Sequence, residues 1–285
     1  MAAARATAER SRSVVSVKDG ARLRETVEAA LLARAPDEAL EELLGRGVLA
    51  EALPEVCATR ALDQEVGRRH KNVWAHTKQV VAQARRDPTV RWGALLHDIG
   101  KVPTRRVDDD GRVTFHGHAQ VGAKMFADIR HRLVFPESLG AAVAALIAQH
   151  QRTNQYEPGW TDSAVRRFAA QAGEYLDPLL ALSRADVTSA SPTKRQHVGA
   201  RLDELEARIA ALREIDARPA PLPTGLGHAL LARLDRQPGP WLGGLMRALR
   251  ERIDRGELRA GQPSAYYLEH IELDPLLQAE AGKEP

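Results

Sequence analysis

The sequence has little sulfur and few aromatic side chains, and each scarcity excludes a class of site. Its 285 residues include one cysteine, Cys57, which excludes an intramolecular disulfide and a zinc site built from thiolates. Aromatic residues make up 4% of the chain, which leaves few stacking platforms and argues against an RNA-recognition sheet or an oligonucleotide-binding barrel. The sequence also has no glycine-rich phosphate loop of the kind that follows a strand in nucleotide-binding folds.

Apolar stretches of membrane-spanning length are missing as well. The longest apolar run, residues 139–148, is far shorter than the ~20 residues that a helix needs to cross a bilayer. The first residues carry several arginines but no apolar segment of the kind that marks a secretory signal. We therefore expect a cytoplasmic protein with no membrane partner.

Neither positive nor negative charge predominates in the sequence. The 41 lysine and arginine residues nearly balance 38 acidic residues, which leaves a formal net charge of +3. This surplus is too small to coat a nucleic acid, although it permits a local site for an anion. Hydrophobic residues make up 44% and charged residues 28% of the chain, values that are typical of a folded globular protein.

Helical periodicity dominates the chain and predicts an all-α fold with one small hairpin. The turn Asp-Asp-Asp-Gly at 108–111 joins two strand-like segments, 104–107 and 112–115, which is the pattern of a β-hairpin. Apolar residues at helical spacing predict the main helices over these ranges: 89–99, 119–129, 136–149, 162–172, 175–189 and 194–215. Gly100 follows the first of them as a candidate left-handed helix cap.

Breaks in this pattern divide the chain into four parts. Segment 1–18 is rich in Ala, Arg and Ser and predicts a disordered tail, and 19–70 predicts several short helices. The main helical domain spans 71–217. A proline-rich linker then opens a helical C-terminal segment, 218–285.

Histidine and aspartate residues recur within or at the ends of the apolar helices of the main domain. Six of them have this placement: His76, His97, Asp98, His118, His150 and Asp186. A single histidine on an apolar face is usually a satisfied core residue, but the whole series is hard to obtain by chance. A buried carboxylate without a partner costs several kcal/mol, and a divalent metal ion is a natural partner. Nitrogen and oxygen ligands without thiolate suit Mn, Fe, Ni, Co, Zn or Mg.

The string HDIGK at 97–101, preceded by His76 and followed by Asp186, resembles the signature of the HD superfamily of metal-dependent phosphohydrolases. Longer stretches, among them VWAHTKQV (73–80) and ALLHDIGKVPTRR (94–106), resemble more narrowly the HD-containing body of bacterial CCA-adding tRNA nucleotidyltransferases. The likeness extends to a neck-like segment before the main domain and a tail-like segment after it. It implies an HD-type helical bundle flanked by helical extensions.

The resemblance implies a role for each candidate residue. A first metal takes four ligands: His76, His97, Asp98 and Asp186. A second metal, present in two-metal members, takes His118 and His150, with Asp98 bridging. Lys101 matches a lysine that neutralises a phosphate oxygen, so that Asp98 and Lys101 are the expected catalytic residues. The alternative for Lys101 is a solvent-exposed lysine after a helix end.

Other basic side chains are candidates for gripping a substrate phosphate. They are Arg105, Arg166, Arg167 and Lys194. Arg166 and Arg167 follow a predicted helix start, where an anion is favoured by the helix dipole. A solvated helix face is the simpler explanation for each of these residues.

The resemblance is incomplete at the N-terminal side. The enzymes in question begin with a nucleotidyltransferase head, which holds a Gly-Ser pair and two metal-binding carboxylates. The residues before the neck-like segment contain no such motif. We therefore expect that this sequence inherits the HD activity and not the addition of CCA to tRNA.

The expected function is that of a metal-dependent phosphodiesterase or phosphatase. The resemblance implies nucleotides or RNA ends as substrates, for example 2′,3′-cyclic phosphates, with one or two divalent metals activating a water molecule that attacks phosphorus. A first alternative is a non-catalytic tRNA- or RNA-binding body that acts with a separate partner. A second is a nucleoside triphosphate or alarmone hydrolase, which shares the metal ligands.

Overall fold

The computed structural model describes residues 16–62, 72–217 and 220–282. Within these ranges it consists of helices and one two-stranded antiparallel hairpin, which confirms the predicted all-α fold with a small hairpin. The expected tail 1–18 lies outside the described residues up to position 15, and the first helix begins at Val17. The chain divides into two compact units, residues 1–210 and 211–285, which are described separately below.

The first unit opens with short helices that pack on the helices of the main domain. These elements are α1 (Val17–Leu31), α2 (Pro36–Gly45), α3 (Val48–Ala52), α4 (Pro54–Ala58) and the 3₁₀ turn η1 (Thr59–Ala61). Leu23, Val27 and Leu31 lie at helical spacing on the buried face of α1. This face packs against α2, α3 and α6 (Pro88–Leu96).

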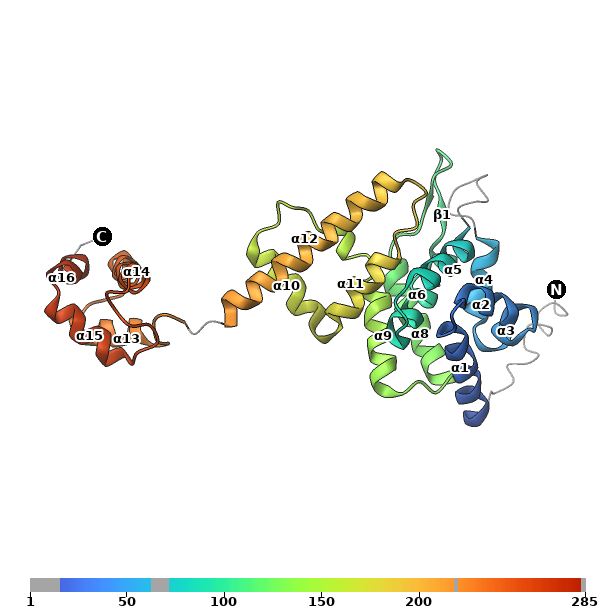
Figure 1. Cartoon of the computed structure of the whole chain (residues 1–285), viewed down its shortest axis with the longest axis horizontal. Helices are drawn as coiled ribbons and strands as arrows, with labels where there is room; N and C mark the ends of the chain where they lie inside the picture. The colour runs from blue at the N-terminus through green and yellow to red at the C-terminus, as the bar shows by residue number, and fades with distance from the viewer. Residues whose placement is uncertain (1–15, 63–71, 218–219, 283–285) are drawn as a thin grey trace, which may run out of the picture. The chain divides into compact units, whose positions relative to one another are not determined.

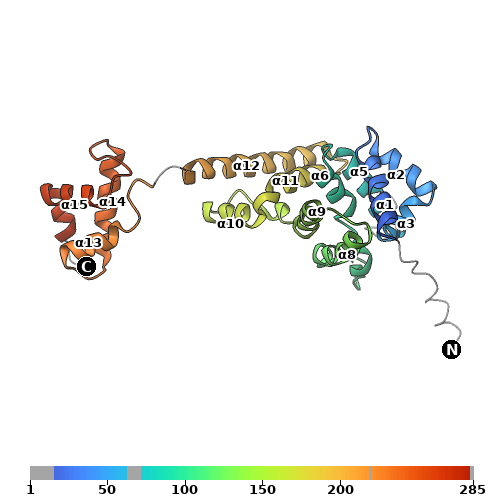
Figure 2. The same ribbon diagram turned by 90° about the horizontal axis from the view of Figure 1, so that it is seen from below.

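The rest of the first unit contains the main helices and the hairpin (Figures 1 and 2). Besides α6, its elements are α5 (Val73–Gln83), α7 (Lys101–Thr104), β1 (Arg106–Val107), β2 (Val113–Thr114), α8 (His118–Arg132), α9 (Glu137–Gln149), η3 (Thr153–Gln155), α10 (Asp162–Ala172), η4 (Gly173–Tyr175), α11 (Leu176–Ala185) and α12 (Pro192–Ala217). The predicted helices therefore all occur, with ends that differ by a few residues.

Helix α6 is the central element of this unit. Every residue from Val90 to Leu96 is buried, because α1, α5, α9 and α11 all pack against it. Its N-terminus is capped by the Asp87 carboxylate, which accepts a hydrogen bond from Val90 N at 3.0 Å. A helix covered on all sides places the residue that follows it, His97, in the interior of the domain.

Two side chains of α6 fasten it to α1 and the turn that follows α1. The buried guanidinium of Arg91 donates hydrogen bonds to the carbonyl oxygens of Leu31, Ala33 and Ala84. The indole N–H of Trp92 donates to the Glu28 carboxylate at 2.9 Å. A buried guanidinium needs such acceptors, because an unpaired charge in the interior is costly.

Gly100 does not have the left-handed conformation predicted from the sequence. Its backbone is right-handed, with φ −68° and ψ −12°. The glycine is required instead by the close approach of α8: a Cβ atom at this position would overlap the carbonyl oxygen of His118 and lie 2.6 Å from Gly122 N. The absence of a side chain therefore allows the segment after His97 to lie directly against the start of α8.

We expect Gly100→Ala to lower the free energy of unfolding by about 3 kcal/mol, the upper range for overpacking, because backbone atoms and not a flexible side chain must move. Urea unfolding followed by circular dichroism measures the change. Gly199→Ala is the matched control, since nothing lies within 4 Å of its Cβ position in α12. An unchanged midpoint for Gly100→Ala would contradict the close packing of α7 and α8.

The hairpin occurs where the turn sequence predicted it, with shorter strands. Arg106 pairs with Thr114 and Val107 with Val113. The Asp108 carboxylate accepts a hydrogen bond from Arg112 N at 2.7 Å and closes the turn. After β2 the chain turns through Gly117, whose φ of 74° is readily adopted only by glycine, into α8. The second strand thus leads directly to His118.

The second unit has its own apolar core. Its helices after α12 are α13 (Leu226–Leu234), α14 (Pro240–Asp254), α15 (Ser264–Leu273) and α16 (Pro275–Gly282). The core contains Trp241, Leu245, Leu249 and Tyr267. The Tyr267 hydroxyl lies 2.9 Å from the Pro221 carbonyl oxygen.

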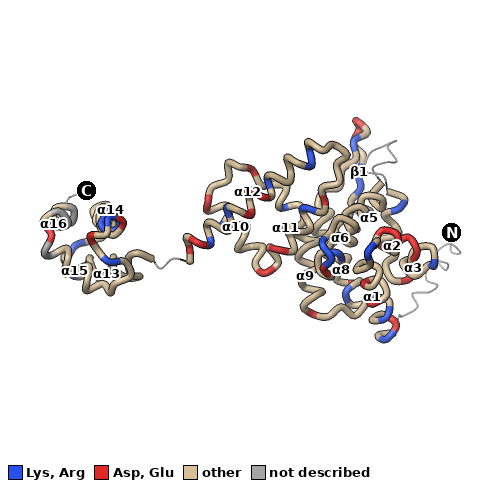
Figure 3. Tube along the Cα trace, viewed as in Figure 1, with Lys and Arg blue, Asp and Glu red and all other residues tan. Residues whose placement is uncertain are grey.

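Basic and acidic residues are interspersed along the described chain rather than gathered in one segment (Figure 3). This distribution agrees with the small net charge of the sequence. Among the described residues, no helix is both long and apolar enough to cross a membrane.

Candidate metal centre

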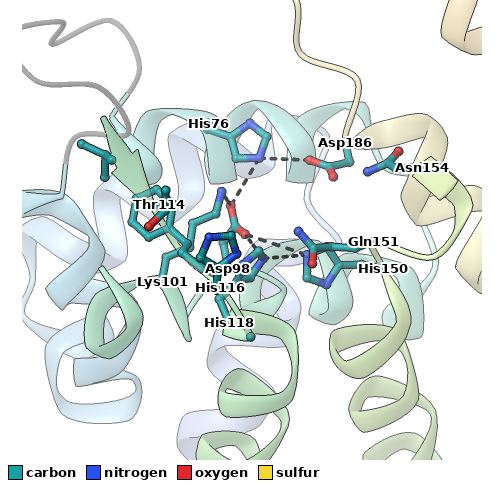
Figure 4. A pocket seen from close by; sticks show the side chains of 13 residues that line it. His76, Asp98, Lys101, Thr114, His116, His118, His150, Gln151, Asn154 and Asp186 are labelled. Carbon is teal, nitrogen blue, oxygen red and sulfur yellow. Dashed lines mark hydrogen bonds and ion pairs between the residues drawn. The ribbon is translucent and has the colours of Figure 1, made fainter. Parts of the chain in front are cut away.

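Five of the six histidine and aspartate residues singled out in the sequence line one pocket of the first unit (Figure 4). The sixth, His97, is buried, and its Nε2 lies 3.2 Å from Asp98 Oδ2. The six residues form two groups of three, within each of which the ligand atoms all lie within 4.8 Å of one another. The first group is His76, His97 and Asp186, and the second is Asp98, His118 and His150. These residues come from α5, α8 and the C-terminal ends of α6, α9 and α11.

The first group is a triangle of two imidazoles and one carboxylate. His76 Nε2 lies 3.0 Å from Asp186 Oδ1 and 3.3 Å from His97 Nε2. His97 Nε2 lies 3.6 Å from Asp186 Oδ1. Three ligand atoms directed at one another at such distances surround a space of the size that a single ion takes.

Asp98 lies between the two groups, and its two oxygens face different histidines. Oδ2 is 3.2 Å from His97 Nε2 and 3.6 Å from His76 Nε2. Oδ1 is 3.4 Å from His118 Nε2 and 4.0 Å from His150 Nε2. The carboxylate is buried, with 3% of its side chain exposed. One side chain is therefore shared by both groups.

The orientation of three histidine rings is fixed by the backbone. Nδ1 of His97, His118 and His150 lies 2.8–2.9 Å from the carbonyl oxygen of the residue three positions earlier. A carbonyl only accepts, so Nδ1 must carry a hydrogen, and the lone pair of a neutral ring then resides on Nε2. This hydrogen bond presents Nε2 of each ring to the centre of the site.

The donor set fits a divalent metal. The Nε2 atoms of His118 and His150 are 3.1 Å apart. With both Nδ1 atoms protonated, these two facing nitrogens are acceptors in the neutral rings, and two facing acceptors repel each other unless a cation lies between them. Histidine nitrogens held by a hydrogen bond on the opposite ring nitrogen, together with carboxylates, are common metal ligands. The buried cluster therefore fits a metal site.

The sequence predicted that Asp186 lies inside a helix over 175–189, but the structure places it just after the end of a helix. Helix α11 ends at Ala185, and Asp186 is the residue that caps it. The side-chain amide of Gln83 donates to the carbonyl oxygen of Ala185 at 2.6 Å, which satisfies a backbone acceptor that a continuing helix would have used. Because the helix ends there, the following chain brings Thr188 Oγ1 to within 2.9 Å of His76 Nδ1.

Burial and charge shift the pKa values of three groups of the centre in different directions. Burial disfavours the charged form of His97, but the Asp98 and Asp186 carboxylates outweigh it and raise the pKa of His97 to about 9. Burial likewise disfavours the Asp98 carboxylate, but His97 and Lys101 hold its pKa well below the usual range. Burial lowers the pKa of His150 to about 4. His150 is thus neutral at pH 7 and keeps a lone pair for a ligand.

The centre lies at the bottom of a pocket of about 540 Å³. The hairpin forms one wall with Thr114, Phe115 and His116, and the turn after α9 forms another with Gln151 and Asn154. Such a volume accommodates a small organic ligand.

Lys101 also lines the pocket, whereas the other basic candidates do not. Its Nζ lies 2.7 Å from Asp98 Oδ2 and 5.5 Å from the centre of the Phe115 ring. The four residues outside the pocket lining are Arg105, Arg166, Arg167 and Lys194. Arg166 and Arg167 lie on α10, and Lys194 lies on α12.

Several polar residues of the site, among them Thr188, Gln151 and Asn154, were not identified from the sequence. Thr188 orients His76, and Gln151 and Asn154 face into the pocket. Thr188 follows Asp186 by two positions, and Gln151 follows His150 directly. Their position next to a candidate ligand was the available signal, although polar residues beside a helix end are common.

The segment that holds this site is similar to known proteins. Residues 72–191 match the family model of the HD domain. The chain is 36% identical over 214 residues to the A-adding tRNA nucleotidyltransferase of Deinococcus radiodurans, an alignment that covers 72% of this chain and 48% of that protein. It is 33% identical over 156 residues to the CC-adding tRNA nucleotidyltransferase of Thermus thermophilus, which covers 53% of this chain and 35% of that protein.

These matches confirm the resemblance on which the sequence analysis relied. The segment 72–191 is therefore similar to the HD domain of a superfamily of metal-dependent hydrolases, and the rest of the chain lies outside that match. More closely, the chain is similar to tRNA nucleotidyltransferases. It spans about half the length, or less, of the curated relatives described above.

Proposed function

We propose that the chain is a metal-dependent phosphohydrolase that acts on phosphate esters of nucleotides or RNA ends, such as 2′,3′-cyclic phosphates. The observation that carries this proposal is the placement of Asp98 between two histidine groups whose Nε2 atoms converge at the bottom of a pocket. A lysine beside that carboxylate, Lys101, supplies a positive charge for a phosphate.

Two ions can be held by the residues present. His76, His97 and Asp186, with Oδ2 of Asp98, would hold one, and His118 and His150, with Oδ1 of Asp98, would hold the other. When bound, a divalent metal supplies a Lewis acid that lowers the pKa of a water molecule and polarises the phosphoryl oxygens. Mn, Ni, Co, Fe, Zn and Mg are all compatible with these ligand types.

The side chains of the pocket supply binding and charge rather than a nucleophile. Among the described residues that line it, there is no cysteine or serine, and Thr114 carries the one aliphatic hydroxyl. Lys101 is placed to stabilise the negative charge that develops on the phosphoryl oxygens in the transition state. Water is therefore the nucleophile that the pocket favours.

The charge of the pocket favours one phosphate over a chain of phosphates. Lys101 is the one lysine or arginine among its described lining residues, and two carboxylates, those of Asp98 and Asp186, also line the pocket. A triphosphate or an alarmone carries several negative charges and would leave most of them unpaired here. A monophosphate or a cyclic diester fits better.

A tRNA end is a second candidate ligand, because both relatives described above are tRNA nucleotidyltransferases by name. In this alternative the chain binds tRNA without hydrolysing it and acts with a separate partner. Filter binding of tRNA at several salt concentrations, combined with the hydrolysis assay below, distinguishes the two candidates. Binding without hydrolysis under any metal condition would favour the alternative.

A substrate screen tests the proposal. Purified protein is incubated with each divalent metal and with 2′,3′-cyclic nucleotides, nucleoside monophosphates, bis-p-nitrophenyl phosphate and RNA that ends in a cyclic phosphate. We expect hydrolysis that depends on the metal and that His97→Ala abolishes. His131→Ala is the matched control, because His131 is an exposed histidine of α8 outside the pocket. Equal activity in the wild type and His97→Ala would contradict the proposal.

Metal removal should lower the melting temperature. The ligands come from different helices and converge only in the folded state, so that metal binding stabilises that state. At a metal concentration of 100 times Kd the stabilisation is ~2.7 kcal/mol, which corresponds to a shift of roughly 5–10 °C. Scanning calorimetry before and after EDTA treatment measures it. His97→Ala should show little response to EDTA, and a wild type that does not respond would rule out a buried site shared by several helices.

A further inference from the structure

In the turn that follows α9, some side chains pack against the rest of the domain and others face the pocket. Thr153, inside η3, is buried, and its Oγ1 lies 2.7 Å from Ser183 Oγ of α11. Arg152 is also engaged away from the pocket: it donates to Gln149 Oε1 at 3.0 Å and lies over the Phe168 ring. These contacts hold the backbone of the turn in place.

Gln151 and Asn154 project from the same side of this turn. They are three positions apart, and Asn154 N donates to the Gln151 carbonyl oxygen at 3.2 Å. A 3₁₀ conformation has three residues per turn, so side chains three positions apart lie above one another. Both side chains reach the pocket, opposite Lys101 and Thr114 (Figure 4). Within the described part of the chain, neither carboxamide makes a hydrogen bond of its own.

The chemistry of two free carboxamides selects a neutral polar ligand. A carboxamide both donates and accepts hydrogen bonds but carries no charge. It therefore matches sugar hydroxyls and the edge of a base better than it matches a phosphate. Asn154 lies next to Asp186 in the pocket, and no lysine or arginine lines this side among the described residues. The positive charge of Lys101 lies on the opposite side.

We propose that Gln151 and Asn154 bind the nucleoside part of a ribonucleotide and thereby determine substrate specificity. The proposal rests on the proposed phosphohydrolase function, which places the phosphate at Lys101 and the metal ligands. In this arrangement the phosphate and the nucleoside of one molecule lie on opposite sides of a single pocket. A phosphate ester without a sugar or a base makes no use of the two carboxamides.

The double substitution Gln151→Met and Asn154→Leu tests this, because both replacements keep the approximate side-chain size and remove the hydrogen-bonding groups. The expected result is a loss of about tenfold in kcat/KM for 2′,3′-cyclic AMP, the scale of two lost hydrogen bonds. The rate with bis-p-nitrophenyl phosphate, which lacks a nucleoside, should not change. Gln155→Met is the matched control, since this carboxamide belongs to the same turn but does not line the pocket.

A binding measurement on EDTA-treated protein provides a readout that does not depend on activity. Saturation-transfer NMR with 3′-AMP should show transfer to ribose and base protons in the wild type and Gln155→Met, and little in the double variant. Equal transfer in the wild type and the double variant, or none in the wild type, would overturn the assignment. So would an equal loss of kcat/KM with both substrates. A wild type that binds 3′-AMP but hydrolyses nothing with any metal would refute the proposed function while leaving this assignment intact.

Discussion

Replacing Asp98 by asparagine should remove both the bound metal and the hydrolytic activity. Its two carboxylate oxygens face different histidine groups, so this one substitution removes a ligand charge from both. Asparagine has nearly the same size but no charge, and its nitrogen cannot bind a metal as the carboxylate oxygen does. We expect a loss of at least ~10³-fold in kcat with bis-p-nitrophenyl phosphate, at or above the top of the range for removing one charge-stabilising group. Elemental analysis should find almost no metal.

The matched control for this substitution is Asp177→Asn. Asp177 is an exposed carboxylate of α11 that pairs with Arg85 at 2.6 Å, away from the pocket. It should retain wild-type metal content and activity, because exposed ion pairs contribute little to stability. Near-ultraviolet circular dichroism establishes that Asp98→Asn is folded. A folded Asp98→Asn protein with the metal content of the wild type would show that Asp98 is not a shared ligand.

Replacing Lys101 by alanine should lower kcat by roughly 10²-fold and leave the metal content near that of the wild type. The ammonium group is positioned by Asp98 and lies over the Phe115 ring in a partly buried environment, with 12% of its side chain exposed. A charge held in such a place needs little reorganisation when the phosphoryl oxygens become more negative, which is the condition for a large electrostatic effect. Steady-state kinetics and elemental analysis on the same preparation measure both quantities.

Lys78→Ala is the control for the loss of a lysine. Lys78 forms an ion pair with Glu41 and lies over Trp74, outside the pocket. Full activity of Lys101→Ala at saturating substrate would mean that another cation neutralises the phosphate. Loss of its metal would mean that Lys101 acts by holding Asp98 in position.

The ligands of the centre were predictable because their chemistry conflicts with their surroundings. His97 and Asp98 follow a helix in which every residue from Val90 to Leu96 is buried, and a carboxylate in such a place needs a cation. The conflict is visible in the sequence as polar residues at the end of an apolar run. The hairpin was predictable for a similarly local reason, since the turn sequence closes on itself through Asp108.

Features that depend on contacts between distant segments were not predictable in the same way. A left-handed cap was expected at Gly100 because glycine often ends a helix in that conformation. The structure shows instead that glycine is required there by the close approach of α8. The helix that contains Ala185 was predicted to continue, but the Gln83 amide, 102 positions earlier, accommodates its end. Gln151 and Asn154 lie on the opposite side of the pocket from Lys101, and the walls of this pocket come from separate parts of the chain.

The hydrogen bonds of Arg91 connect the segment that matches the HD domain to residues that precede it. The residues that match the HD family model begin at position 72, yet two of the acceptors of this buried guanidinium, Leu31 and Ala33, belong to the segment before it. A fragment limited to 72–191 would leave a charge without those partners and would uncover Trp92, in the same helix that leads to His97. The segment that matches the HD domain therefore depends on residues outside that range for burial and hydrogen bonding, and trimming the chain at position 72 would disturb the ligands from a distance.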